Sequence, residues 1–180
     1  MQEKALLLVS REVNLSDIAF LPNNLLKTFR GLSFEISREI IELPSYAYNS
    51  MRKQYNSTLL LKHIARVKPK GYSKCLGIVD VDIYVEGLNF VFGEAILNGG
   101  EAIVSLHRLK PEFYGDPANE KLLFKERILK EVVHELGHTF GLTHCLNPKC
   151  VMHFSNSIID TDFKSDRLCS ACQTKLFSIL

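Results

Sequence analysis

Short apolar runs and one alternating segment predict the strands of a sheet. The continuous run in residues 4–10 predicts a central strand. Residues 32–42 alternate between apolar and polar positions, which predicts a half-buried strand that ends at Leu43-Pro44. Further strands are predicted at residues 102–106 and in the region 74–84, which is broken by Asp80 and Asp82. Residues 88–95 are predicted as a short edge strand and precede a turn at residues 98–100.

Apolar residues at helical spacing predict three helices. The first begins between residues 17 and 22 and stops at Gly31. Residues 45–56 are polar and rich in tyrosine, so we expect a loop there. The second helix follows Ser57, a candidate N-cap, and runs to about Val67.

The third helix has the broadest apolar stripe, so we expect it to be largely buried. Asp116 and Pro117 offer an N-cap followed by proline at the first helical position, and the helix then runs to about Phe140. No repeat, low-complexity segment or linker interrupts residues 1–180. A single domain is therefore predicted.

A histidine motif closes the third helix and continues beyond it. His134 and His138 are four residues apart, so on a helix they lie on one face and can bind one ion side by side. Glu135 lies one step round the helix and reaches a water molecule on that ion. Gly141 offers the left-handed residue that ends a helix and lets the chain bring His144 to the same ion. Three protein ligands leave one zinc position open for water, which is typical of a catalytic site.

Composition and charge exclude several classes of protein. The chain has 180 residues, 46% of them hydrophobic, which describes an ordinary globular protein. A net charge of +2 is too small to imply nucleic-acid binding. No segment has the pattern of a signal peptide or a membrane span. We expect a cytoplasmic monomer with no membrane partner.

Four of the five cysteines lie close together near the end of the chain. Cys145 and Cys150 form one pair and Cys169 and Cys172 another, and eighteen residues separate the two pairs. Without a secretory signal this spacing favours a metal over disulfides, and four thiolates around zinc make a closed site. Cys75 lies in a distant apolar run and is expected to be a buried free thiol.

The segment from residue 52 to residue 74 is basic and has two interpretations. It carries Arg52, Lys53, Lys62, Arg66, Lys68, Lys70 and Lys74 and no acidic residue. A solvated helix face and loop is the favoured interpretation. A rim that attracts an acidic ligand or nucleic acid is the alternative. The two carboxylates that follow, Asp80 and Asp82, are expected to be turn and strand-end residues.

The tail extends the histidine motif into a pattern that resembles the archaemetzincin family, part of the metzincin clan of zinc peptidases. The pattern is HExxHxxGxxHC, then x4-C-x-M, then CxxC, and it covers residues 134–172. Residues 84–95 also look like that family. The resemblance implies an α/β fold with a mixed twisted sheet, an active-site helix, an N-terminal subdomain of about residues 1–144 and a zinc-tied C-terminal subdomain of residues 145–180.

The resemblance also implies a role for each residue of the motif and two zinc ions per chain. The ligands of the catalytic zinc are matched by His134, His138 and His144, and the general base is matched by Glu135. Met152 matches the methionine of the turn beneath that zinc. The ligands of a structural zinc are matched by Cys145, Cys150, Cys169 and Cys172. In metzincins the substrate lies along an edge strand above the zinc. Residues 88–92 are our candidate for that strand.

Several neighbours of the motif have no fixed role at this stage. His153 is expected to be a surface residue or a residue that bonds to a ligand, because both metal sites already have their ligands. His63 and His107 stand alone and are not expected to be ligands. Arg127, Lys130 and Glu131 precede the ligands on the same helix, and any of them can support a ligand through a hydrogen bond.

Three functions from different classes follow from these features. The leading hypothesis is a zinc metallopeptidase that hydrolyses peptides with a zinc-activated water and with Glu135 as general base. The alternative is a zinc-stabilised peptide-binding module with little or no turnover, which has no need of a base. A disulfide-stapled secreted protein is the third hypothesis.

Overall fold

A five-stranded mixed sheet forms the centre of the molecule. The computed structural model describes residues 3–116 and 120–180. The strand order is β2-β1-β5-β8-β7, and every neighbouring pair is parallel except β7 and β8. Strand β7, the antiparallel one, is last in this order and lies at one edge of the sheet. The strands are β1 (Glu3–Ser10), β2 (Leu32–Ile41), β5 (Lys74–Val79), β7 (Gly93–Ala95) and β8 (Glu101–Ser105).

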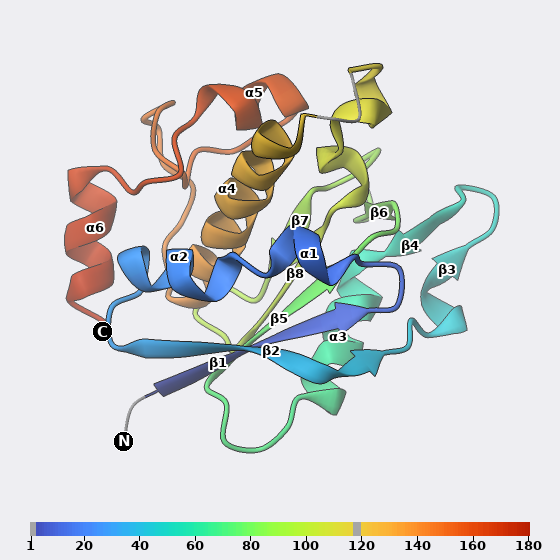
Figure 1. The fold of residues 1–180 in the computed structure, drawn as a ribbon, viewed down its shortest axis with the longest axis horizontal. Coiled ribbons are helices and arrows are strands. Elements are labelled where there is room, and N and C mark those ends of the chain that lie inside the picture. Colours follow the sequence, from blue (N-terminus) through green and yellow to red (C-terminus); the bar gives the residue numbers. More distant parts are fainter. Residues whose placement is uncertain (1–2, 117–119) are drawn as a thin grey trace.

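Helices cover both faces of this sheet (Figure 1). One face packs against α1 (Leu15–Ile18), α2 (Leu21–Thr28) and the long helix α4 (Lys121–Thr139). The other face packs against α3 (Ser57–Val67). Alternate side chains of a strand point to opposite faces, so Leu7 belongs to the first core and Leu8 to the second. This arrangement confirms the predicted α/β fold with a mixed sheet.

A small second sheet occupies the region predicted to be a loop. It contains β3 (Tyr48–Asn49), β4 (Gln54–Asn56) and β6 (Ile83–Tyr84), and a 3-10 turn at Ser45–Ala47 precedes it. The strand region predicted at residues 74–84 is interrupted at Asp80 and Asp82, as expected, and its last two residues belong to this second sheet. Strand β5 ends at Val79, and β6 pairs with β4 instead.

The helix starts differ from those predicted. Asn56, not Ser57, caps α3, and its side chain accepts a hydrogen bond from the backbone N–H of Leu59. The first predicted helix is divided into α1 and α2. Helix α4 begins at Lys121, after 3-10 turns at His107–Leu109 and Pro111–Tyr114; Pro117 of the predicted start lies outside the described residues.

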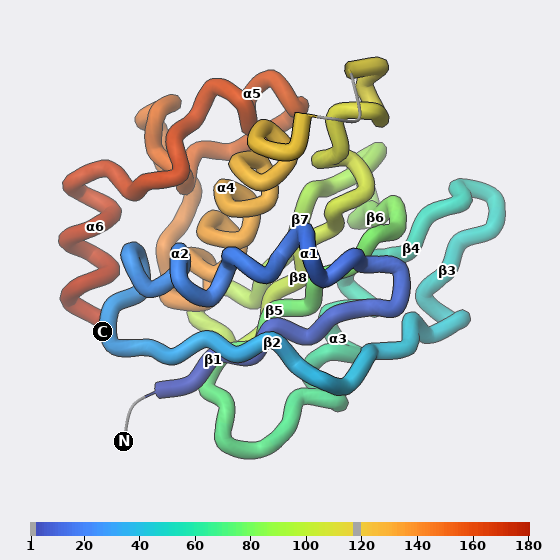
Figure 2. The backbone as a smooth tube through the Cα atoms, in the orientation of Figure 1, coloured from blue at the N-terminus to red at the C-terminus, as the bar shows by residue number. Residues whose placement is uncertain are grey.

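The tail after α4 folds back along that helix (Figure 2). It contains α5 (Ile158–Phe163) and α6 (Ser170–Phe177). Val151, Met152 and Leu176 of the tail are buried in the same core as α4. Within the described residues, no helix has both the length and the apolar character needed to cross a membrane.

Candidate active site

The last two turns of α4 bring the three histidines of the motif together. His134 and His138 lie one above the other, with 3.1 Å between their Nε2 atoms. Gly141 has a φ of 79°, and its N–H donates to the carbonyl of His138, so the helix ends in a left-handed residue as predicted. The chain then returns, and His144 offers a ring nitrogen that lies within 4.8 Å of nitrogens on the other two rings.

Backbone carbonyls fix the rings of two of these histidines. The Nδ1–H of His134 donates to the carbonyl of Val151 at 2.8 Å. The Nδ1–H of His138 donates to the carbonyl of Leu142 at 2.7 Å. In both rings the proton on Nδ1 leaves the Nε2 lone pair free for a metal, and such contacts hold a ligand in its binding orientation. The donor set therefore fits a zinc ion.

Burial also keeps these histidines in the form that binds a metal. Burial lowers the pKa of His134 well below the usual value of 6.5, and the neighbouring Lys164 ammonium adds to this. Burial lowers the pKa of His138 and of His144 as well. Neutral imidazoles are the ligand form, so at neutral pH the rings do not need to lose a proton before binding a metal.

Glu135 lies between the histidines and the edge strand. It is buried and lines the cleft that opens at the histidines. Burial, and then the carboxylate of Glu131, raise the pKa of Glu135 well above its ordinary range. A side chain on Gly93 of β7 would place a Cβ atom 2.6 Å from Cγ of Glu135. The glycine in the strand therefore makes room for this carboxylate.

Met152 packs beneath the histidine-bearing turns of α4. It is fully buried, and a Cβ atom on Gly137 would lie 2.5 Å from its sulfur atom. The glycine inside the histidine motif is therefore a contact surface for the methionine. This is the position that the resemblance predicts for Met152, although its role beneath a metal remains a prediction.

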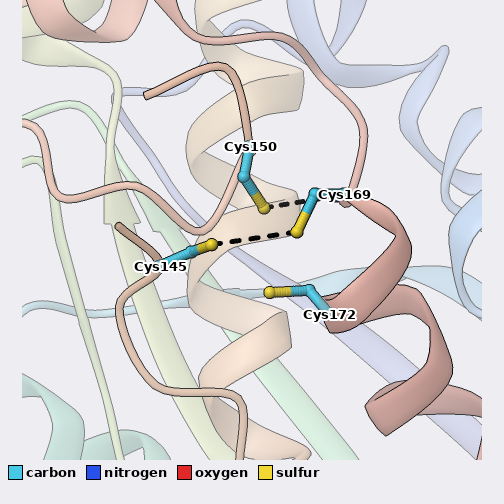
Figure 3. Close-up of side chains that lie close together, drawn as sticks. All are labelled: Cys145, Cys150, Cys169 and Cys172. Carbon is cyan, nitrogen blue, oxygen red and sulfur yellow. Dashed lines mark hydrogen bonds between the residues drawn. The ribbon is translucent and has the colours of Figure 1, made fainter. Parts of the chain in front are cut away.

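The four cysteines of the tail form a second cluster (Figure 3). Their four Sγ atoms all lie within 4.8 Å of one another. The Sγ atoms of Cys145 and Cys169 are 3.8 Å apart, and the N–H of Cys169 donates to Sγ of Cys150 at 3.3 Å. A hydrogen bond from the backbone of Cys172 lowers the pKa of Cys169 to about 7. All five cysteines are free, which argues against a disulfide framework, and Cys75 is buried as predicted.

The two clusters are joined through adjacent residues. His144 and Cys145 are neighbours in sequence and belong to different clusters. The N–H of Cys145 donates to the carbonyl of Met152 at 2.9 Å. The Nδ1–H of His153 donates to the carbonyl of Cys145 at 2.8 Å, so His153 supports the junction and belongs to neither cluster.

A cleft of about 620 Å³ runs past the histidines. Residues 87–95 form one wall, α4 forms the floor and residues 154–156 form the opposite wall. The predicted substrate strand at residues 88–92 has no strand conformation; the edge strand is β7, at Gly93–Ala95. Arg52 fixes the irregular segment, because its Nη2 donates to the carbonyls of Leu88 and Asn89 at 2.9 Å.

A buried lysine that the sequence did not indicate lies behind the histidines. Nζ of Lys164 is 2.9 Å from a carboxylate oxygen of Glu131 and 3.5 Å from Nδ1 of His134, and the side chain of Lys164 is fully buried. Arg127 forms an ion pair with Asp162 at 2.7 Å and ties α5 to α4. A lone lysine in a polar segment gives no pattern from which this position can be predicted.

Comparison with known proteins decides the family to which this site belongs. The family model described as "Peptidase family M54" matches residues 32–178. The chain belongs to peptidase family M54. It is 55% identical to an archaemetzincin of Methanocaldococcus jannaschii over 136 residues. These aligned residues cover 76% of this chain and 73% of that protein. An archaemetzincin of Pyrococcus furiosus is 49% identical over 172 residues, covering 92% and 88% of the two chains.

A solved structure agrees with this membership. The crystal structure of an archaemetzincin from Methanopyrus kandleri matches 98% of this chain and 94% of that chain with a TM-score of 0.86 and 36% identity. The M54 membership confirms the resemblance read from the motif. The protein is a zinc metallopeptidase, and the alternative of a binding module without turnover is not favoured.

Proposed function

We propose that His134, His138 and His144 hold a catalytic zinc ion and that Glu135 is the general base of peptide hydrolysis. The observation that carries this proposal is the convergence of three neutral imidazoles, two of them oriented by carbonyls, beside a buried carboxylate. A zinc ion in this position supplies Lewis acidity and lowers the pKa of a bound water molecule to about 7.

Glu135 performs the proton transfers in this mechanism. It accepts a proton from the attacking water and donates it to the leaving amine nitrogen. The raised pKa of Glu135 means that the negative charge of the carboxylate is poorly stabilised by its buried surroundings. A nearby cation favours the charged form, which is the form that can act as a base.

We further infer that Cys145, Cys150, Cys169 and Cys172 hold a second, structural zinc ion. Four cysteine sulfurs without a free position make a closed tetrahedral site, which contributes to folding rather than to catalysis. This proposal gives two ions per chain. It also supports one catalytic domain, in which residues 1–144 form the N-terminal subdomain. The cysteines tie residues 145–180 to one another, and the shared core packs them against the N-terminal subdomain.

The test is the change Glu135→Ala with zinc content measured on the same samples. We expect peptide hydrolysis to fall by at least about 100-fold, because general acid–base catalysis contributes that much or more. Two zinc ions per chain should remain bound. The matched control is Glu126→Ala, which removes an exposed carboxylate from the same helix and should leave the rate unchanged. An unaffected rate in Glu135→Ala would contradict the assignment.

A further inference from the structure

The cleft has a polar foot and an apolar rim. Glu131, His134 and Glu135 line it and are only 3–5% exposed, so they lie at its deepest part. Leu88, Leu97 and Phe154 also line it and are 43–54% exposed, so they form the rim. Of the three residues at the foot, the proposed function uses His134 and Glu135. Glu131 has no part in it.

The carboxylate of Glu131 is fixed by one of its two oxygens. Oε1 is 2.9 Å from Nζ of Lys164 and accepts a hydrogen bond from the hydroxyl of Thr161 at 3.0 Å. Both partners are fully buried behind α4, away from the cleft lining. No hydrogen bond within the described residues reaches Oε2, although Glu131 lines the cleft. The second oxygen is therefore available to a bound molecule.

A second polar group that lines the cleft lacks a partner. The hydroxyl oxygen of Ser155 is buried and makes no hydrogen bond within the described residues. Ser155 lies in the wall opposite β7 and lines the same cleft. A buried polar atom without a partner costs free energy, so such atoms commonly mark places where a ligand or water completes the bonding.

The charge of the lining selects the kind of ligand. The acidic residues that line the cleft are Glu94, Glu131 and Glu135, and no lysine or arginine among the described residues lines it. Glu94 is already held by the hydroxyls of Ser57 and Thr58, and Glu135 is assigned to the reacting water. Glu131 is thus the one lining carboxylate with a free oxygen and no role in the reaction.

We propose that the foot of the cleft is a subsite for a cationic side chain of the peptide, a lysine or arginine next to the scissile bond, with Glu131 as its acceptor and Ser155 as a second contact. The apolar rim suits the methylene stem of such a side chain, which is long enough to carry its charge past the rim. The proposal rests on the proposed function, because it takes the peptide to lie across the three histidines.

The decisive measurement uses binding, not turnover. Two succinyl hydroxamates that differ only in one side chain, 4-aminobutyl or n-butyl, are titrated into the zinc-loaded protein. A hydroxamate binds zinc and so sets the position of the side chain. We expect the aminobutyl compound to bind about tenfold more tightly or better, because a charge-assisted hydrogen bond contributes that much. Equal affinity of the two compounds for the wild-type protein would overturn the proposal.

Variants locate the effect within the cleft. Glu131→Gln alone would leave the Lys164 ammonium buried without its partner, so it is combined with Lys164→Met. In this double variant we expect the preference to fall to about twofold or less while zinc content is retained. Ser155→Ala, which leaves the ion pair intact, should reduce the preference severalfold. A full preference in both variants would remove Glu131 and Ser155 from the subsite.

A matched control separates a local contact from general attraction. Glu86→Gln changes an exposed carboxylate that does not line the cleft, and the preference should stay unchanged. Failure of the subsite and failure of the proposed function give different results. Hydrolysis of peptides without the preference contradicts the subsite alone, whereas the preference without any peptide hydrolysis contradicts the peptidase mechanism alone.

Discussion

At the scale of single residues, the position of Glu135 depends on the absence of a side chain at Gly93. A Cβ atom there would lie 2.6 Å from Cγ of Glu135 and 2.6 Å from the carbonyl oxygen of Ile103. Both distances are far shorter than van der Waals contact. Neither neighbour can yield without a shift of the carboxylate or of strand β8. The position of the proposed general base is therefore set partly by a residue that has no side chain.

The variant Gly93→Ala tests this dependence. We expect kcat/KM to fall by about 100-fold, because a misplacement of about 1 Å can cost that much. Zinc content should stay unchanged, since the three histidines are not displaced by the added methyl group. The melting temperature measured alongside shows how much of the loss comes from strain in the sheet. Activity within about twofold of the wild type would show that the strand adjusts at no cost.

Cys75 provides a prediction about pH. Burial raises its pKa from 9.0 to about 12. Between these values the unfolded chain loses the thiol proton while the folded chain keeps it, so the folded state is disfavoured as pH rises from about 9 to 12, by at most about 1.4 kcal/mol per pH unit.

Denaturation of wild type and Cys75→Ala over this pH range measures the effect. The free energy of unfolding should decline less steeply with pH in the variant. Iodoacetamide should modify Cys75 in the native protein only as fast as the chain unfolds, because the buried thiol stays protonated. Equal slopes in the two proteins would show that Cys75 ionises without cost in the folded state.

The histidines were predictable and Lys164 was not, for a physical reason. Because His134 and His138 are four residues apart, their side chains lie on the same face as soon as the segment is helical, and Gly141 indicates where the helix ends. Such information is local in sequence. Lys164 meets Glu131 only because α5 folds back onto α4, and this contact joins residues that are 33 positions apart with no periodic pattern between them.

At the scale of elements, the end of α4 is held by the first residue of the central strand β5 and by the turn between β7 and β8. Nζ of Lys74 donates to the carbonyls of Thr139 at 2.8 Å and Gly99 at 2.7 Å. The N–H of Asn98 donates to the carbonyl of His138 at 2.9 Å. A cation at a helix C-terminus satisfies carbonyls that have no partner within the helix. Lys74 thus steadies the turn that carries one of the proposed ligands.

Removal of this cap by Lys74→Met should weaken both the helix end and the metal site. We expect a loss of about 1 kcal/mol in the free energy of unfolding, because one charged cap is removed and a similar aliphatic chain remains. Zinc should be removed by a chelator at lower concentration. Lys70→Met, which changes an exposed lysine in the same basic segment, is the control. An effect of equal size in the control would exclude a specific role for the cap.

The sequence predicted long elements better than short ones. Strands β1, β2 and β8 and helix α4 have enough residues for their apolar period to be recognised. Strands β3, β4 and β6 have two or three residues each, which is too few for a period of two to be seen. Residues 88–92 looked like a strand because they are aromatic, but hydrogen bonds from Arg52 hold them in an irregular conformation.

At the scale of the whole molecule, the cysteine cluster and the histidine cluster share a short segment. The dipeptide His144-Cys145 contributes to both, and the N–H of Cys145 is fixed by the carbonyl of Met152. Any movement of the tail at Cys145 is therefore passed to His144. The cysteine cluster acts on the proposed catalytic site through the backbone, without a direct contact between the two sets of ligands.

The variant Cys169→Ser tests this coupling. We expect affinity for the histidine-bound zinc to fall by about 10- to 100-fold, which is the usual effect of disturbing groups that orient a ligand. Competition with a chelator, read together with hydrolysis, measures this change. Cys75→Ala serves as the control, because Cys75 lies outside both clusters. Unchanged affinity and activity would mean that the cysteine cluster only fastens the tail.

The carbonyl of Val151 has a consequence for the order in which the protein is made. It fixes the ring of His134 but follows it by 17 residues. During synthesis the chain therefore contains all three histidines before it contains the group that orients the first of them. At that stage the ring of His134 still lacks its partner, whereas the partner of His138, the carbonyl of Leu142, is already present. The fixed orientation of His134 therefore belongs to the finished fold and not to the isolated helix.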